Sequence, residues 1–202
     1  MTHPAADAII DLYERHAQAW DAARGRTLFE RPWLERFLAA APPDLPILDL
    51  GCGSGEPIAR FMIDHRRRVT GVDSSATAIA LCRARFPHES WIVADMRALA
   101  LPTRFGGIVA WDSFFHLTPE DQRAMFARFA AHAAPGAALL FTSGPKAGEA
   151  IGAFEGEALY HASLDAAEYR ALLEAQGFAV LAHAVEDPAC GGHTIWLAAL
   201  SR

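Results

Sequence analysis

The sequence has few cysteines and no long apolar run, and both absences narrow what the protein can be. The three cysteines among 202 residues, Cys52, Cys82 and Cys190, are odd in number and widely spaced. They form neither a metal-ligand pattern nor a disulfide framework. No apolar stretch approaches the roughly 20 residues that span a bilayer, and the N-terminal segment lacks the basic-then-apolar layout of a signal peptide. We therefore expect a cytoplasmic protein without a bound metal.

A strong charge of either sign is also missing. The chain has 18 Lys and Arg against 24 Asp and Glu, a formal net charge of −6. A mildly acidic domain gains no counterion-release attraction to nucleic acid or to anionic lipid. The apolar fraction of 52% is typical of a globular chain with a substantial core. We expect a monomer or homodimer with no nucleic-acid or membrane partner.

Short apolar runs alternate with helical patterns along most of the chain, which is typical of β-α units over a parallel sheet. The runs are 46–50, 69–73, 91–95, 106–111 and 137–143. Two further runs, 178–185 and 193–200, are separated by too few residues for a helix and should form an antiparallel pair. Amphipathic stripes predict helices in residues 1–45. We predict one α/β domain, with 1–45 as a helical cap over a core of residues 46–202.

Two helices in the second half carry clear boundary signals. Thr118 followed by Pro119 predicts an N-cap and a first helical residue. Ser163 similarly predicts the start of a later helix, and Gly177 fits the position just past its end. Between these helices, residues 144–163 have no clear period and include several glycines. We predict that they form a long loop on the substrate side.

A glycine-rich turn, residues 49–55 (DLGCGSG), follows the first apolar run. Closely spaced glycines let a backbone turn sharply and approach a ligand, although tight turns also use glycine for structural reasons alone. Asp73 ends the next run, 22 residues after Gly51, near the spacing of about 20 at which a carboxylate reaches ribose hydroxyls. Asp95 ends the third run. Asp49, inside the turn, would repel a pyrophosphate and suits a ligand with an amino group or a sulfonium.

These residues resemble the class I S-adenosylmethionine-dependent methyltransferases, and most closely the small, single-domain members that act on small molecules. The resemblance covers essentially the whole chain. It implies a three-layer Rossmann-like fold whose seven-stranded, mostly parallel sheet has the order 3-2-1-4-5-7-6 and an antiparallel last strand. It also implies that the glycine turn wraps the methionine part of the cofactor. The pattern of residues 13–21 is similar to a family helix that closes over the cofactor.

The resemblance implies a set of residues that bind S-adenosylmethionine. They are Asp49, Gly51, Cys52, Gly53, Asp73, Ser74, Asp95, Met96, Trp111, Trp20 and Arg24. In the family, the residue matching Asp73 holds the ribose and the pair matching Asp95 and Met96 contacts the adenine. The carboxylates also have a structural interpretation, because Asp favours turns and can hold the N–H groups of its own loop.

The segment after the fourth apolar run should face the methyl acceptor. His116 is the candidate general base, because an ordinary histidine pKa of about 6.5 allows proton uptake at neutral pH. Packing under the cofactor is its structural alternative. Candidate substrate contacts come from this segment and from residues 144–163. They are Asp112, Phe115, Glu155, Tyr160 and His161.

The predicted reaction is transfer of a methyl group from S-adenosylmethionine to a nitrogen, oxygen or sulfur atom of a small molecule, with S-adenosylhomocysteine as the product. Positioning the reactants can supply about 7–11 kcal/mol, whereas a base adds about 10²–10⁴-fold. Two alternatives are a cofactor-binding sensor without turnover and an NAD-dependent dehydrogenase. The dehydrogenase shares the glycine turn but fits Asp49 and the final antiparallel pair poorly.

Overall fold

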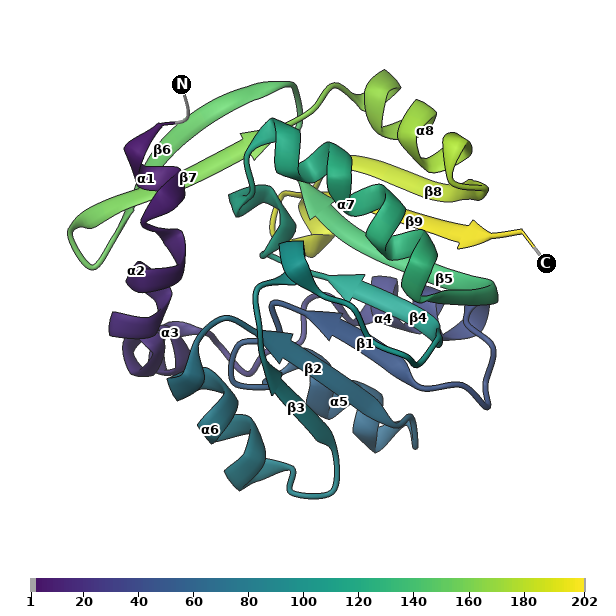
Figure 1. Cartoon of the computed structure of the whole chain (residues 1–202), viewed down its shortest axis with the longest axis horizontal. Helices are drawn as coiled ribbons and strands as arrows, with labels where there is room; N and C mark the ends of the chain where they lie inside the picture. Colours follow the sequence, from purple (N-terminus) through teal and green to yellow (C-terminus); the bar gives the residue numbers. More distant parts are fainter. Residues whose placement is uncertain (1–2, 202) are drawn as a thin grey trace.

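A central sheet of seven strands organises the computed structural model, which describes residues 3–201 (Figure 1). Its strands are β1 (Ile47–Leu50), β2 (Val69–Asp73), β3 (Ser90–Val93), β4 (Phe105–Ala110), β5 (Ala133–Ser143), β8 (Phe178–Asp187) and β9 (His193–Leu200). The order is β3-β2-β1-β4-β5-β9-β8; β1–β5 pair in parallel, and β9 runs antiparallel to both β5 and β8. This confirms the predicted order, because β8 and β9 are the sixth and seventh strands of this sheet.

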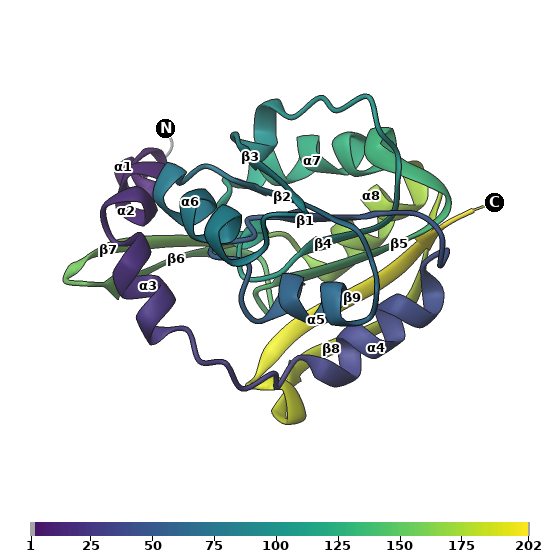
Figure 2. The same ribbon diagram turned by 90° about the horizontal axis from the view of Figure 1, so that it is seen from below.

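Helices cover both faces of the sheet, which makes three layers (Figure 2). One face packs against α4 (Arg31–Ala40), α5 (Ile58–Asp64) and α6 (Ala76–Arg85), and the other against α7 (Pro119–His132) and α8 (Ala166–Ala175). Three shorter helices, α1 (Pro4–Asp7), α2 (Ile9–Arg15) and α3 (Ala17–Ala23), lie beyond the carboxyl ends of β1 and β2. Three single-turn helices are η1 (Met96–Ala98), η2 (Phe114–His116) and η3 (Pro188–Cys190). No helix within residues 3–201 is long and apolar enough to cross a membrane.

Helix α4 belongs to the sheet layers, although the sequence placed it in the cap of residues 1–45. Its Trp33, Leu34 and Phe37 are buried in the core under β1 and β4. Gly107 on β4 makes this approach possible, since a Cβ there would lie 2.4 Å from the Phe37 ring. The apolar stripe of α4 thus packs on the sheet, and only α1–α3 cover its edge.

The prediction of a loop at 144–163 is wrong: these residues form a β-hairpin of β6 (Gly148–Phe154) and β7 (Glu157–Ser163). A two-residue turn joins the strands, with positive φ at Glu155 (50°) and Gly156 (79°). Strand β6 is exposed along nearly its whole length. Because neither face of β6 packs on the core, its sequence shows no apolar alternation, and the periodicity test fails.

The sequence signals predicted the start of α7 correctly and the start of α8 incorrectly. Thr118 caps α7 by accepting a hydrogen bond from the N–H of Asp121. Helix α8, however, begins after Asp165, whose side chain accepts from the N–H of Ala167. Ser163 is instead the last residue of β7. Gly177 follows the end of α8 with φ of 81°, as predicted.

Candidate active site

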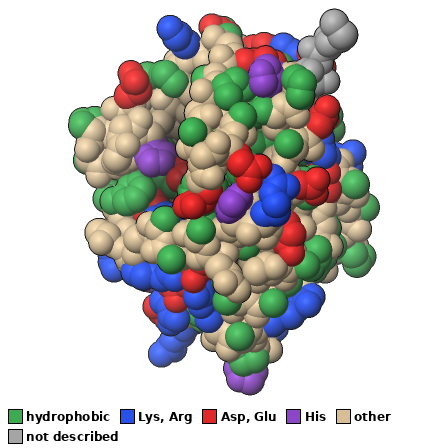
Figure 3. All heavy atoms as spheres, turned by 90° about the vertical axis from the view of Figure 1, so that its left-hand side faces the viewer, with side chains coloured by type: hydrophobic (Ala, Val, Ile, Leu, Met, Phe, Trp, Pro, Cys, Tyr) green, Lys and Arg blue, Asp and Glu red, His purple; other side chains and the backbone are tan. Residues whose placement is uncertain are grey.

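A cavity of about 690 Å³ lies at the carboxyl ends of β1, β2 and β4, beneath α1–α3. All of the predicted cofactor residues line it, from Asp49 in the glycine turn to Trp20 and Arg24 in the cap. His116 and Asp112 line it as well. Figure 3 shows the face formed by α1–α3 and the hairpin, where acidic side chains lie next to basic and histidine side chains. The sheet edge therefore gathers residues from most of the chain around one space.

The glycine turn after β1 is held in a conformation that side chains would disturb. Gly51 and Gly53 have φ of 72° and 53°. A Cβ on Gly51 would lie 2.2 Å from the Cβ of Ser113. Asp73 fixes the turn from the neighbouring strand, because its carboxylate accepts the N–H of Gly53 at 2.9 Å and that of Ser75 at 2.8 Å. Burial raises the pKa of Asp73, although these hydrogen bonds oppose the shift.

Asp49 presents an unpaired carboxylate to the cavity. Its side chain is 4% exposed and makes no hydrogen bond to any residue within 3–201. It therefore does not hold the N–H groups of its own turn, the structural alternative that the sequence left open. Burial, reinforced by the charge of Asp73, raises the pKa of Asp49 to about 7. A buried carboxylate without a partner is costly, and it fits a cationic group of a ligand.

Asp95 has partners of its own. Its carboxylate caps η1 by accepting the N–H of Arg97 at 2.8 Å and pairs with that guanidinium at 2.7 Å. Arg97 also reaches Asp121 at the start of α7, at 3.1 Å. Burial raises the pKa of Asp95, but the hydrogen bonds from Arg97 outweigh it and leave the pKa below its ordinary value. Asp95 thus stays ionised beside Met96 at the cavity wall.

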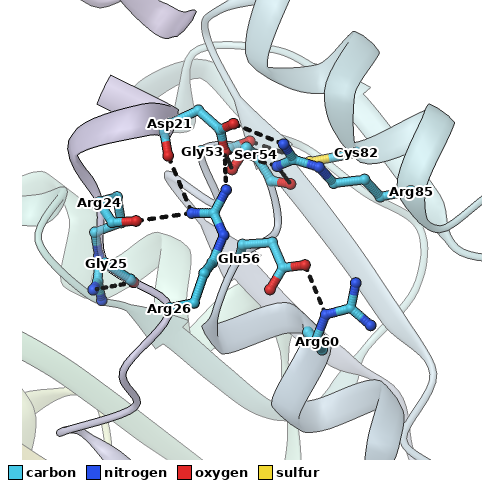
Figure 4. Close-up of polar contacts among 10 residues, drawn as sticks. All are labelled: Asp21, Arg24, Gly25, Arg26, Gly53, Ser54, Glu56, Arg60, Cys82 and Arg85. Atoms are coloured by element: carbon cyan, nitrogen blue, oxygen red, sulfur yellow. Dashed lines mark hydrogen bonds and ion pairs between the residues drawn. The ribbon is translucent and has the colours of Figure 1, made fainter. Parts of the chain in front are cut away.

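Polar contacts tie the cap to the glycine turn and to α6. Asp21 on α3 pairs with the guanidinium of Arg85 at 2.7 Å and accepts from the hydroxyl of Ser54 (Figure 4). Glu14 on α2 accepts from the hydroxyl of Ser75, ahead of α6, at 2.6 Å. Hydrogen bonds from the guanidinium of Arg85 hold the pKa of Asp21 well below its ordinary value. Sequence reasoning assigned no role to Asp21 or Glu14.

Tyr13 and His116 form a hydrogen-bonded pair in the wall of the cavity. The Tyr13 hydroxyl lies 2.8 Å from Nε2 of His116, and Nδ1 of His116 lies 2.7 Å from the carbonyl oxygen of Tyr160. A carbonyl only accepts, so Nδ1 carries the proton and Nε2 accepts the proton of Tyr13. Burial lowers the pKa of His116 to about 4 and raises that of Tyr13. The pair is therefore neutral at pH 7.

The structure does not bring four of the five predicted substrate residues to the cavity, and only Asp112 lines it. Glu155 lies in the hairpin turn, and Tyr160 is fully buried with its hydroxyl donating to Glu149 at 2.9 Å. The rings of Phe115 and His161 pack against His116, each with centroids 4.8 Å from it. Residues 148–154 and 157–163 are strands, so successive side chains point to opposite faces of the hairpin. They therefore do not all point into the cavity, as the side chains of a loop could.

Several of the residues that line the cavity were not predicted from the sequence. Besides Tyr13, they include Asp7, Ser113, Glu120 and Glu149. Tyr13 could have been found from the family-like pattern of residues 13–21. No local signal marks Asp7 on α1 or Glu149 on β6, which reach the cavity through the packing of α1 and the hairpin. Residues 3–201 contain no cluster of three or more potential metal ligands.

Comparison with known proteins identifies the fold of this chain. Residues 47–136 match the family model described as a methyltransferase domain. The fold is that of a class I methyltransferase. Over its whole length the chain superposes on a Burkholderia thailandensis 1,6-didemethyltoxoflavin N1-methyltransferase, solved with that substrate and S-adenosylhomocysteine. The TM-score is 0.74 at 19% identity, covering 100% of this chain and 92% of the other.

Two curated relatives match parts of this methyltransferase-fold chain. A trans-aconitate 2-methyltransferase of Azoarcus sp. (strain BH72) is 40% identical over 68 residues, 32% of this chain and 26% of the relative. A dTDP-3-amino-3,6-dideoxy-alpha-D-glucopyranose N,N-dimethyltransferase of Streptomyces fradiae is 33% identical over 97 residues, 47% of this chain and 38% of the relative. The chain therefore spans between a quarter and two-fifths of the length of these relatives.

Proposed function

We propose that the protein transfers the methyl group of S-adenosylmethionine to a nitrogen, oxygen or sulfur atom of a small molecule. The observation that carries this proposal is the continuity of one cavity. The cavity is lined both by the unpaired carboxylate of Asp49 beside the glycine turn and by the Tyr13–His116 pair and Asp112. Both a cofactor cradle and an acceptor wall are thus open to the same space, which favours turnover over a cofactor sensor.

The residues of the cradle fit the chemical groups of S-adenosylmethionine. Asp49 suits its ammonium group, Arg24 its carboxylate and Asp73 its ribose hydroxyls, with Asp95 and Met96 beside the adenine. The bound cofactor supplies a methyl carbon made electrophilic by the sulfonium. An NAD pyrophosphate would instead meet the negative charge of Asp49, which favours the methyltransferase over the dehydrogenase.

On the acceptor wall, the chain's own residues orient the nucleophile. The Tyr13 hydroxyl donates a hydrogen bond to Nε2 of His116, so its oxygen is free to accept a hydrogen bond from an acceptor N–H or O–H. His116 then acts through Tyr13 and not as a free base. Asp112 provides a second acceptor on the same wall. Since positioning contributes more than base catalysis, these contacts are proposed to align the nucleophile.

The named substrates of the relatives and the free cysteines bear on the substrate class and on the cellular location. The named substrates of the relatives, trans-aconitate and a nucleotide-linked amino sugar, are small molecules. We propose a small-molecule acceptor, and a monomer or homodimer working in the cytoplasm. The cysteines are unpaired in the structure, which suits a reducing compartment.

Calorimetry and a product screen test the proposal. We expect S-adenosylmethionine and S-adenosylhomocysteine to bind and NAD not to bind. D73N should weaken binding, whereas the matched control E155Q, in the hairpin turn, should bind as the wild type does. Pools of small amines, alcohols and thiols are then screened for S-adenosylhomocysteine formation. Binding of NAD alone would establish the dehydrogenase, and cofactor binding without product from any pool would favour the sensor.

A further inference from the structure

His193 reaches the cavity wall from the start of β9, although no role has been derived for it above. Its Nε2 lies 3.0 Å from Oδ1 of Asp112, and its Nδ1 lies 2.8 Å from the carbonyl oxygen of Cys190. Asp112 is the cavity residue directly after Trp111, just past the end of β4. The contact joins residues 81 positions apart in the chain. His193 itself does not line the cavity and can act there only through Asp112.

The geometry of this contact requires two protons on the ring. A carbonyl oxygen and an ionised carboxylate can only accept hydrogen bonds. Neutral histidine has one N–H, so one ring nitrogen would then turn a lone pair toward an oxygen. The imidazolium satisfies both contacts. Two aromatic rings flank it, those of Phe29 and Trp111, with centroids 5.4 Å away on each side, an environment that favours a cation.

The charged and titratable groups around His193 support the same protonation state. They are Asp112 after β4, Glu30 ahead of α4, Arg24 at the end of α3, Asp187 at the end of β8 and the thiol of Cys190 in η3. Arg24 is already paired with Glu30. The hydrogen bond to Asp112 raises the pKa of His193, and this outweighs the lowering that burial causes.

Asp112 needs such support because its backbone is unfavourable. It has φ of 49°, a region that residues with a side chain seldom adopt. Its N–H donates to the hydroxyl of Thr142 at 2.9 Å, which fixes the backbone. The side chain has only a marginal contact to Thr142, at 3.5 Å, besides its pairing with His193. The direction of the carboxylate therefore depends mainly on His193.

We propose that His193 is a positioning residue, whose imidazolium holds the Asp112 carboxylate toward the methyl acceptor and favours acceptors that carry an N–H donor. The assignment of Asp112 to the acceptor rests on the proposed function, whereas the ion pair does not. Nε2 of His193 lies 3.0 and 3.2 Å from the two Asp112 oxygens, and each oxygen keeps a further lone pair that can accept a hydrogen bond from an acceptor amine. When His193 loses its proton, one ring nitrogen turns a lone pair toward an oxygen atom. The ion pair is then lost, and Asp112 is released.

The ion pair is tested without turnover, by NMR of the full chain carrying ¹⁵N-labelled histidine. H193Q identifies the His193 signals by their loss, and H88Q, at an exposed position, serves as the control. We expect both ring nitrogens of His193 to be protonated at pH 7. In D112N the pKa of His193 should fall by at least about 1. A neutral His193 ring at pH 7, or a pKa unaffected by D112N, would overturn the proposal.

The positioning role is tested with a pool of small primary and secondary amines and a matched pool of alcohols and thiols. For wild type, transfer to the amine pool should fall as the pH rises through the pKa of His193. H193Q keeps an uncharged N–H donor for Asp112, so it should lose the pH dependence and about 10-fold in amine transfer. Its affinity for S-adenosylhomocysteine should match that of H88Q.

The outcomes separate the two proposals. If H193Q and wild type share one pH profile and one rate, His193 is only structural and the inference fails. If neither pool yields S-adenosylhomocysteine with the wild type, the proposed function fails, while the NMR result still decides the ion pair. Transfer to alcohols and thiols in preference to amines would overturn the acceptor preference alone.

Discussion

Replacing Asp49 with asparagine should make the free protein more stable and its cofactor binding weaker. Asp49 is 4% exposed, and its carboxylate has no hydrogen-bond partner among residues 3–201. The folded state therefore disfavours its charged form, and the pKa rises from 3.8 to about 7. Between these two pH values the folded protein binds more protons than the unfolded chain. Stability consequently falls as the pH rises through this window.

The size of the effect follows from the shift. Each pKa unit is worth about 1.4 kcal/mol, so the rise from 3.8 to about 7 costs about 4 kcal/mol once the pH is above 7. Below pH 4 the cost vanishes, because Asp49 is protonated in both states. The asparagine amide avoids the charge but still leaves polar atoms without partners, at about 1–3 kcal/mol. We expect D49N to be about 1–3 kcal/mol more stable than wild type at pH 8.

Urea unfolding at pH 8 and pH 5 measures the free energy of unfolding of D49N, wild type and E155Q. E155Q makes the same carboxylate-to-amide change at the hairpin turn and should behave as the wild type does. The advantage of D49N should shrink from pH 8 to pH 5. Calorimetry should show that D49N binds S-adenosylmethionine about 10- to 100-fold more weakly, as loss of a charged hydrogen bond predicts.

Two results would refute this reasoning. A D49N variant no more stable than wild type at pH 8 would mean that the Asp49 carboxylate is adequately solvated in the free protein. A D49N variant that binds S-adenosylmethionine as tightly as wild type would mean that Asp49 does not meet the ammonium group. The first result concerns the free protein alone and the second only the cofactor, so each identifies the faulty step.

Three further variants test other parts of the structure. Y13F removes the donor to His116 and should slow methyl transfer about 100-fold without changing S-adenosylhomocysteine affinity; equal rates would exclude the pair from catalysis. D21N weakens the contact with Arg85 and should reduce S-adenosylhomocysteine affinity about 10-fold and speed amide hydrogen exchange in α3. T118A removes the N-cap of α7 and should lower the free energy of unfolding by about 1 kcal/mol, measured in urea; no change would exclude a stabilising cap.

The sheet could be predicted from the sequence because its strands are buried. The run at 106–111 is continuously apolar and the run at 46–50 is apolar except for Asp49, and β1 and β4 are buried at every position. The hairpin could not be predicted, because β6 does not pack on the core of the sheet and its sequence carries no pattern of burial. For helix α4 the secondary structure could be predicted, but its position in the fold could not. Its apolar stripe predicts a helix correctly but does not say which surface the helix covers.

In the site, too, the residues that could be predicted are those whose signals lie close together in the sequence. The glycine turn and Asp73 could be identified because their spacing along the chain is short. The partners of Tyr13 and Asp21 could not, since His116 lies 103 residues and Arg85 64 residues further along. His116 was predicted as a base from its ordinary pKa, yet burial keeps it neutral and the carbonyl of Tyr160 fixes the proton on Nδ1.

The way the cap is held explains how a cofactor could reach a covered cavity. Helix α2 buries only Leu12 and helix α3 only Ala17. The cap is held largely by polar contacts, such as the exposed pair of Arg15 with Glu157 and the less exposed pair of Asp21 with Arg85, and by the rings of Tyr13 and Trp20 against Phe154. Exposed ion pairs are worth about 0–1 kcal/mol each, far less than buried apolar side chains. Helices α2 and α3 should therefore open at a lower free energy than the sheet, so that the cavity can exchange its contents while the core stays folded.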